Sequence, residues 1–207
     1  AREWGWFKTA LGKAVFFISL GSFSWGIGSM IWSYYNFFTN VSTPYPSLAD
    51  IGFVLALPLW TIGVISLSRA TGASFGLKKK AGKALLLILP IIIIVASYYL
   101  LVTVARAGVL FSINDGINLK LFLDLIYPIG DIIILSLAFV IFGLSINYLG
   151  GRYKYPILAI LLGFGMMYFA DFVFSYTTTL NTFYNGNFGD LIFTLALSSI
   201  SFGVLGF

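Results

Sequence analysis

The segment YPSLADIGFVLALPLWTIGV, residues Tyr45–Val64, sets the pattern of the chain. It opens on a turn and places Asp50 directly before a long apolar run. Variants of it return as YPIGDIIILSLAFVIFGL (Tyr127–Leu144) and NFGDLIFTLALSSISFGV (Asn187–Val204). Asp50 stands as far from Gly63 as Asp190 stands from Gly203. The pattern predicts an apolar helix headed by an acidic residue, used three times.

The composition is that of a membrane protein. Of the 207 residues, 59% are hydrophobic and only 9% are charged, whereas a soluble domain carries about 25% charged residues. The chain has no cysteine and no histidine, which excludes disulfides, iron–sulfur clusters, most zinc sites and a Ser-His-Asp triad. We therefore expect no cofactor and no metal site. Enzymatic activity is the least favoured function, and an intramembrane hydrolase that uses carboxylates alone is the one enzymatic alternative left open. The net charge of +5 does not indicate nucleic-acid binding, because the placement of charges matters more than their sum.

Six apolar runs are long enough to cross a bilayer, which takes about 20 residues per helix. They predict an all-α integral membrane protein, one bundle over residues 1–207, with helices at about 14–38, 49–67, 84–104, 119–147, 156–179 and 190–207. Ser-Tyr pairs near the ends of the odd-numbered runs and the acid-headed even-numbered runs indicate a hairpin repeated three times in parallel. The Ala1 start and the unflanked end at Phe207 lead us to expect a fragment, for example of a seven-helix domain.

Most of the basic residues lie on one side of the predicted membrane helices. Ten of the twelve lysines and arginines lie in the N-terminus and in the second and fourth connections, whereas Arg106 and Lys120 lie on the other side. Positively charged loops stay in the cytoplasm. We therefore expect a multi-pass protein of a prokaryotic cytoplasmic membrane, with the lipid bilayer as its partner and both termini in the cytoplasm.

Two of the acid-headed segments carry helix-capping signatures. Ser47 precedes Asp50 by three residues, and Asn187 precedes Asp190 by three. In a capping box the side chain of the first residue accepts a hydrogen bond from a backbone N–H in the first turn, and the acidic side chain accepts one from the backbone N–H of that first residue. The acid also lies near the positive end of the helix dipole, which stabilises its charge. We interpret these four residues as structural caps.

Asp124, Asp131 and Asp171 lie deeper along their runs. Asp124 and Asp131 are seven residues apart and share a helix face with Tyr127. Asp171 lies roughly 13 Å from the outer end of its helix. A charge inside the bilayer costs roughly 2.5–3.5 kcal/mol, so these side chains should face the bundle interior. Should the fourth helix begin at Pro128, Asp131 would instead be another N-terminal acid.

These acids admit two interpretations. They bond hydroxyl groups and hold helices together, or they line a polar pocket that opens to the outside. A pocket of carboxylates and tyrosines suits a small cationic or amphipathic ligand. In that interpretation Arg106 supplies the counter-charge, and the predicted ligand-binding residues are Asp124, Tyr127, Asp131, Asp171, Arg106 and Tyr98.

The aromatic and acidic motifs resemble a known family. GIGSMIWSYYNFF (Gly26–Phe38) followed by PYPSLADIGFVLALPL (Pro44–Leu59), with the later YPIGDIIIL, resembles the multi-helix N-terminal membrane sensor regions of bacterial and archaeal diguanylate cyclases and histidine kinases. The resemblance implies a sensory, signal-transduction role, although the chain carries no output module and the family brings no known ligand.

The sequence is therefore consistent with three functions. The first is a membrane-embedded sensory or ligand-responsive domain. The second, from the parallel repeat and the buried acids, is a small-solute transporter. The third is a non-catalytic structural subunit that pairs with a second copy or with another chain of a membrane complex.

Overall fold

The computed structural model describes residues 4–39, 44–105, 119–145, 148 and 153–207. Within these ranges the chain is helical and has no strand. The elements are the 3-10 turn η1 (Trp6–Lys8), α1 (Ala10–Phe38), α2 (Ala49–Ala70), α3 (Ala73–Leu77), α4 (Lys80–Ser97), the π-helical segment η2 (Tyr98–Val104), α5 (Leu119–Ser145), α6 (Lys154–Thr179) and α7 (Phe188–Leu205). Six spans, with α4 and η2 forming one of them, are long and apolar enough to cross a membrane. The expected all-helical class with six such spans is confirmed.

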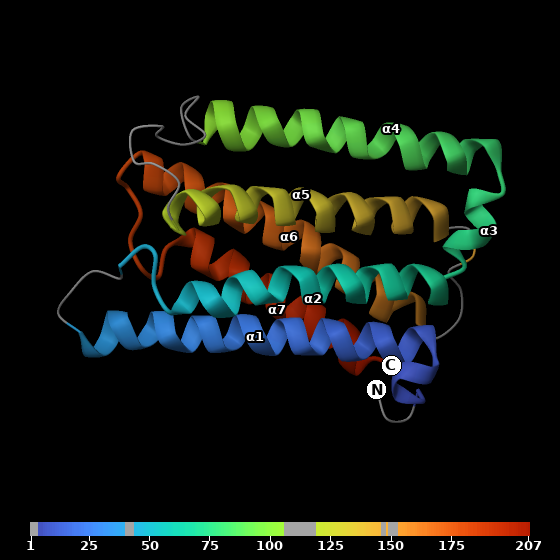
Figure 1. Cartoon of the computed structure of the whole chain (residues 1–207), viewed down its shortest axis with the longest axis horizontal. Helices are drawn as coiled ribbons and strands as arrows, with labels where there is room; N and C mark the ends of the chain where they lie inside the picture. The colour runs from blue at the N-terminus through green and yellow to red at the C-terminus, as the bar shows by residue number, and fades with distance from the viewer. Residues whose placement is uncertain (1–3, 40–43, 106–118, 146–147, 149–152) are drawn as a thin grey trace.

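The helices lie side by side, with both chain termini at one end of the bundle (Figure 1). The end of α1, the start of α2 and the α6–α7 connection lie at the opposite end. The most extensive contacts join α1 to α2 and α6 to α7, while α5 contacts both α2 and α6, and α1 contacts α7. Five helices therefore form a closed ring, and α4 lies outside it against α5.

Glycines let the helices of the two largest pairs approach closely. A Cβ on Gly63 of α2 would lie 2.6 Å from Cγ1 of Ile18 on α1. A Cβ on Gly203 of α7 would lie 2.6 Å from Cγ1 of Ile160 on α6. Both distances are far below an ordinary carbon–carbon contact of roughly 3.5–4.0 Å. Packing of this kind, in which small residues bring backbones together, is typical of helices that associate in lipid.

The centre of the ring is built on Trp60 of α2, which is fully buried. Its ring stacks on Trp25 of α1 at 5.4 Å and meets the edge of Phe164 of α6 at 5.6 Å, both favourable aromatic geometries. The indole Nε1 donates a hydrogen bond of 3.3 Å to Oγ of Ser22. Gly21 leaves room for the ring, because a Cβ there would lie 2.5 Å from its Cδ1 atom. One tryptophan thus ties α1, α2 and α6 together.

The helix bounds differ from the sequence expectation at several ends. The short elements η1 and α3 were not predicted, and α1 begins at Ala10 instead of near residue 14. The third span is not a uniform α-helix, because it turns π-helical at Tyr98. The π-helical segment forms the last seven residues of this span and begins directly after a buried serine, Ser97; π-helical geometry is frequent at functional sites.

Candidate functional site: a polar cluster between helices

The central pair of the candidate site consists of Asp131 of α5 and Asp171 of α6. Asp131 is 7% exposed and Asp171 is half-buried. Their carboxyl groups lie within interaction range of each other across the α5–α6 contact. Because an ionised carboxylate can only accept hydrogen bonds, a hydrogen bond between the two groups needs a proton on one of them. The pair can therefore hold a proton, or a small cation in its place.

The position of Asp131 in its helix excludes a terminal role. Helix α5 runs from Leu119 to Ser145 without a break at Pro128. Asp131 therefore lies three turns inside the helix, well beyond the first turn, where the macrodipole favours an acid. Its burial at this depth is offset by the contact with Asp171 and not by a helix end.

A small cavity adjoins Asp131. Its volume is about 10 Å³, and its lining is Trp60, Asp131, Ile134, Phe164, Met167 and Tyr168. That volume corresponds to about one water molecule. The space next to the carboxyl pair thus suits a water, a proton carrier or a bare ion, and it is far smaller than the few hundred Å³ of a pocket for an organic ligand.

Tyr168 connects the pair to the fourth helix. Its hydroxyl donates a hydrogen bond of 2.8 Å to Oγ of Ser97, which is 1% exposed and precedes the π-helical turn. The same hydroxyl lies close enough to Asp131 for an electrostatic interaction with its carboxyl group. A change at the carboxyl pair can therefore reach the junction of α4 and η2 through one tyrosine.

Asp50 forms a second branch with Tyr127. The Tyr127 hydroxyl donates a hydrogen bond of 2.6 Å to Oδ1 of Asp50 and joins α5 to the start of α2. The other oxygen, Oδ2, accepts from the backbone N–H of Ser47 at 2.7 Å and from its hydroxyl at 3.1 Å. The N-cap position of α2 is Leu48. Ser47 therefore does not cap through its own oxygen as expected, because its hydroxyl donates to Asp50.

The remaining predicted ligand residues lie elsewhere. Asp124 accepts a hydrogen bond of 2.9 Å from the hydroxyl of Tyr45, in the segment before α2. Tyr98 is 59% exposed on η2, and none of the contacts found in the described ranges joins it to a carboxyl group. Arg106 lies outside the described residues. The structure therefore brings together Asp131 and Asp171, and separately Tyr127 and Asp50.

The start of α7 is capped by Asn187. Its Oδ1 accepts from the backbone N–H groups of Gly189 at 2.7 Å and Asp190 at 3.2 Å. Asp190 reaches back through Oδ2 to the N–H of Gly186 at 2.6 Å. Both residues thus satisfy amides that a helix end leaves unpaired, and neither is part of the carboxyl pair.

Ser97 and Tyr168 belong to the site and were not predicted for it. Tyr168 stands three residues before Asp171, and residues three apart are neighbours on a helix surface, so a signal for it was present. Ser97 had no such signal, because its partner is 71 residues away. We call Asp50, Ser97, Tyr127, Asp131, Tyr168 and Asp171 the polar cluster.

Neither the residue chemistry nor known proteins identify a ligand for this cluster. Among the described residues, no group of three or more acidic, histidine or cysteine side chains could hold a metal ion. No protein-family model, no curated protein and no solved structure matches the chain. The resemblance to sensor regions of cyclases and kinases therefore stays a prediction.

Proposed function

We propose that the protein is a membrane-embedded sensory domain that responds to a small cation, the proton included, at the Asp131–Asp171 pair. One observation carries this proposal: two carboxyl groups on neighbouring helices lie within interaction range of each other inside membrane-length apolar helices. Acidic residues at such depth are rare and commonly mark ion or proton sites. The small adjoining cavity favours an ion over an organic ligand.

The contact supplies a two-state element. With one proton bound, one carboxyl group donates to the other, and α5 and α6 are held together. Without it, two like charges would stand within a few ångströms in a medium of low dielectric, where their repulsion is strong. Either α5 and α6 separate or a cation takes the place of the proton. Tyr168 would pass this change to the α4–η2 junction. Tyr127, whose hydroxyl is close enough to Asp171 for an electrostatic interaction, would pass it to α2.

The proposed internal repeat favours a site between its units. Gly63 and Gly203 have the same spacing from their acids, and a Cβ added to either would lie 2.6 Å from an isoleucine Cγ1, that of Ile18 or of Ile160. We propose that the α1–α2 and α6–α7 hairpins are repeats in parallel orientation. With α4–α5 as a middle copy, the carboxyl pair lies between the second and third hairpins, and membrane proteins built from repeats often place their sites at such interfaces.

The charge distribution supports a location in the cytoplasmic membrane. The described basic residues other than Lys120 lie toward the end of the bundle that holds both termini. Basic loops are retained in the cytoplasm. The polar cluster would then lie in the half of the bundle nearer the outside, and the bilayer would cover the apolar outer surface.

The test uses the native tryptophan that shares the cavity with Asp131. In lipid nanodiscs, the emission of Trp60 should change as pH rises and the proton leaves the pair. Asp131→Asn and Asp171→Asn should abolish the change, because an amide N–H replaces the shared proton as the donor. Trp60→Phe assigns the signal, and Asp190→Asn is the matched control. A titration unaltered in both pair variants would refute the proposal.

The same pair would also serve a cation transporter, the second candidate. Uptake of a cation into proteoliposomes, abolished by Asp131→Asn, would favour transport over sensing. In the third candidate role, that of a structural subunit, α4 would contact another chain through its exposed apolar residues. Of these, Leu87 and Val95 are 69% and 64% exposed. Copurification of a second chain at fixed stoichiometry would support that role.

A further inference from the structure

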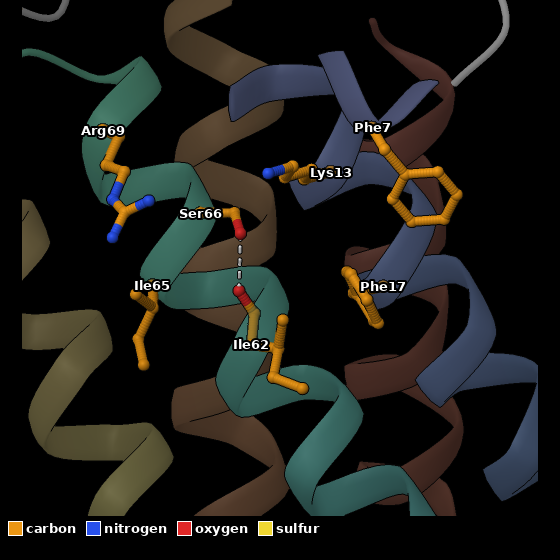
Figure 2. Close-up of a pocket in the computed structure, with 7 residues that line it drawn as sticks. All are labelled: Phe7, Lys13, Phe17, Ile62, Ile65, Ser66 and Arg69. Carbon is orange, nitrogen blue, oxygen red and sulfur yellow. Dashed lines mark hydrogen bonds between the residues drawn. The ribbon is translucent and has the colours of Figure 1, made fainter. Parts of the chain in front are cut away.

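A second candidate site lies at the terminal end of the bundle, away from the polar cluster. There a groove of about 460 Å³ runs between the start of α1 and the end of α2. It is lined by Phe7, Lys13, Phe17, Ile62, Ile65, Ser66 and Arg69 (Figure 2). The volume falls within the range of small-molecule sites, about 300–1,000 Å³.

The groove has one cationic end and one apolar end. Lys13 extends from α1 toward α2, and Arg69 lies on α2 beyond Ser66 (Figure 2). No lining residue is acidic, so two positive charges share the groove without a lining counter-charge, and an anion between them would relieve their repulsion. The Arg69 guanidinium presents donors in a fork that matches phosphate geometry.

The apolar end points along the helices toward the middle of the span. Ile62 and Ile65 are 43% and 41% exposed, and Phe17 of α1 lies across from Ile62 (Figure 2). Ile62 precedes Arg69 by seven residues, so the apolar floor extends roughly 10 Å from the charged end. On a membrane-spanning helix, exposed isoleucines face lipid, so the groove opens sideways into the bilayer.

We propose that this groove binds an anionic phospholipid. Its phosphate lies between Lys13 and Arg69, and the first part of an acyl chain runs over Phe17, Ile62 and Ile65. The hydroxyl of Ser66 donates to the backbone oxygen of Ile62 at 2.8 Å, so Lys13 and Arg69 supply the donors for the phosphate. A free anion would use only the charged end, and a zwitterionic lipid would bring no net charge to the two cations.

The test is lipid binding to the purified protein, followed by native mass spectrometry in detergent. Phosphatidylglycerol should bind in preference to phosphatidylcholine, and Lys13→Gln/Arg69→Gln should weaken its binding about tenfold or more. The matched control is Lys80→Gln/Lys83→Gln, which removes the same charge at the same end outside the groove. Arg69→Lys keeps the charge and should lie between the native protein and the double variant.

Three outcomes would overturn the proposal. Equal loss in the control would mean general attraction of anionic lipid to a basic surface. Equal binding of the two lipids by the native protein would remove the role of the phosphate site. Glycerol 3-phosphate that displaces the lipid at matched concentration would show that the apolar end contributes nothing. Circular dichroism of each variant confirms that the helices are intact.

Discussion

Removal of the Tyr127 hydroxyl tests how strongly the polar cluster joins α2 to α5. Tyr127→Phe deletes one oxygen and leaves the ring in place. The lost contact is the 2.6 Å hydrogen bond to Oδ1 of Asp50. Asp50 is 8% exposed, so water cannot readily replace the missing donor.

The expected magnitude follows from the geometry. Hydrogen bonds to charged groups contribute roughly 1.5–3 kcal/mol in soluble proteins, but contacts between membrane helices average about 0.6 kcal/mol and reach about 1.7 kcal/mol. Asp50 keeps the Ser47 backbone N–H at 2.7 Å, so its carboxyl group is not left without donors. We expect a coupling free energy between Tyr127 and Asp50 of about 1–1.7 kcal/mol, toward the upper part of the membrane range.

The assay is equilibrium unfolding in mixed micelles, followed by circular dichroism, for a double-mutant cycle of Tyr127→Phe and Asp50→Ala. The matched control is Tyr168→Phe, which removes the neutral 2.8 Å bond to Ser97 and should cost about 0.6 kcal/mol. A coupling free energy within about 0.3 kcal/mol of zero, as for independent sites, would mean that Tyr127 and Asp50 do not interact and would refute the reasoning.

Three further predictions concern packing, capping and topology. Gly21→Ala should destabilise by about 1–3 kcal/mol, because its new methyl group overlaps the indole ring 2.5 Å away; Gly26→Ala, with nothing within 4 Å, should be neutral or slightly stabilising in the same unfolding assay. Asn187→Ala should cost about 0.5–2 kcal/mol, as a lost N-cap does, and a thermal shift with no change would contradict the cap. An impermeant thiol reagent should label a cysteine at Asn185 from outside intact cells but not one at Lys79, and the reverse would invert the topology.

The fold was largely predictable from the sequence, because each span must be about 20 residues long and predominantly apolar to cross the bilayer. The six spans were found, and the caps at Asn187 and Asp190 could be read from their spacing. The short helix α3 and the π-helical turn after Ser97 were missed. Neither changes the hydropathy of the chain, so the pattern that located the spans carries no information about them.

The candidate site was predictable only in part. The depth of Asp131 and Asp171 along their runs marked both as residues in need of an interior partner, since a lone charge in lipid is costly. Which partner each would find was not accessible, because it depends on how α5 and α6 are rotated against each other. Tyr98 was expected beside these carboxyl groups, but the tyrosine beside Asp131 is Tyr168 of α6.

Infrared spectroscopy of the carboxyl groups tests the central claim most directly, since it detects a proton shared by Asp131 and Asp171. At neutral pH the native protein in nanodiscs should show the carbonyl stretch of a protonated carboxylic acid. Asp131→Asn and Asp171→Asn should each remove it, because an amide donor then replaces the proton, whereas Asp190→Asn should leave it unchanged. A native spectrum without this band, or a band that persists in both pair variants, would contradict the account.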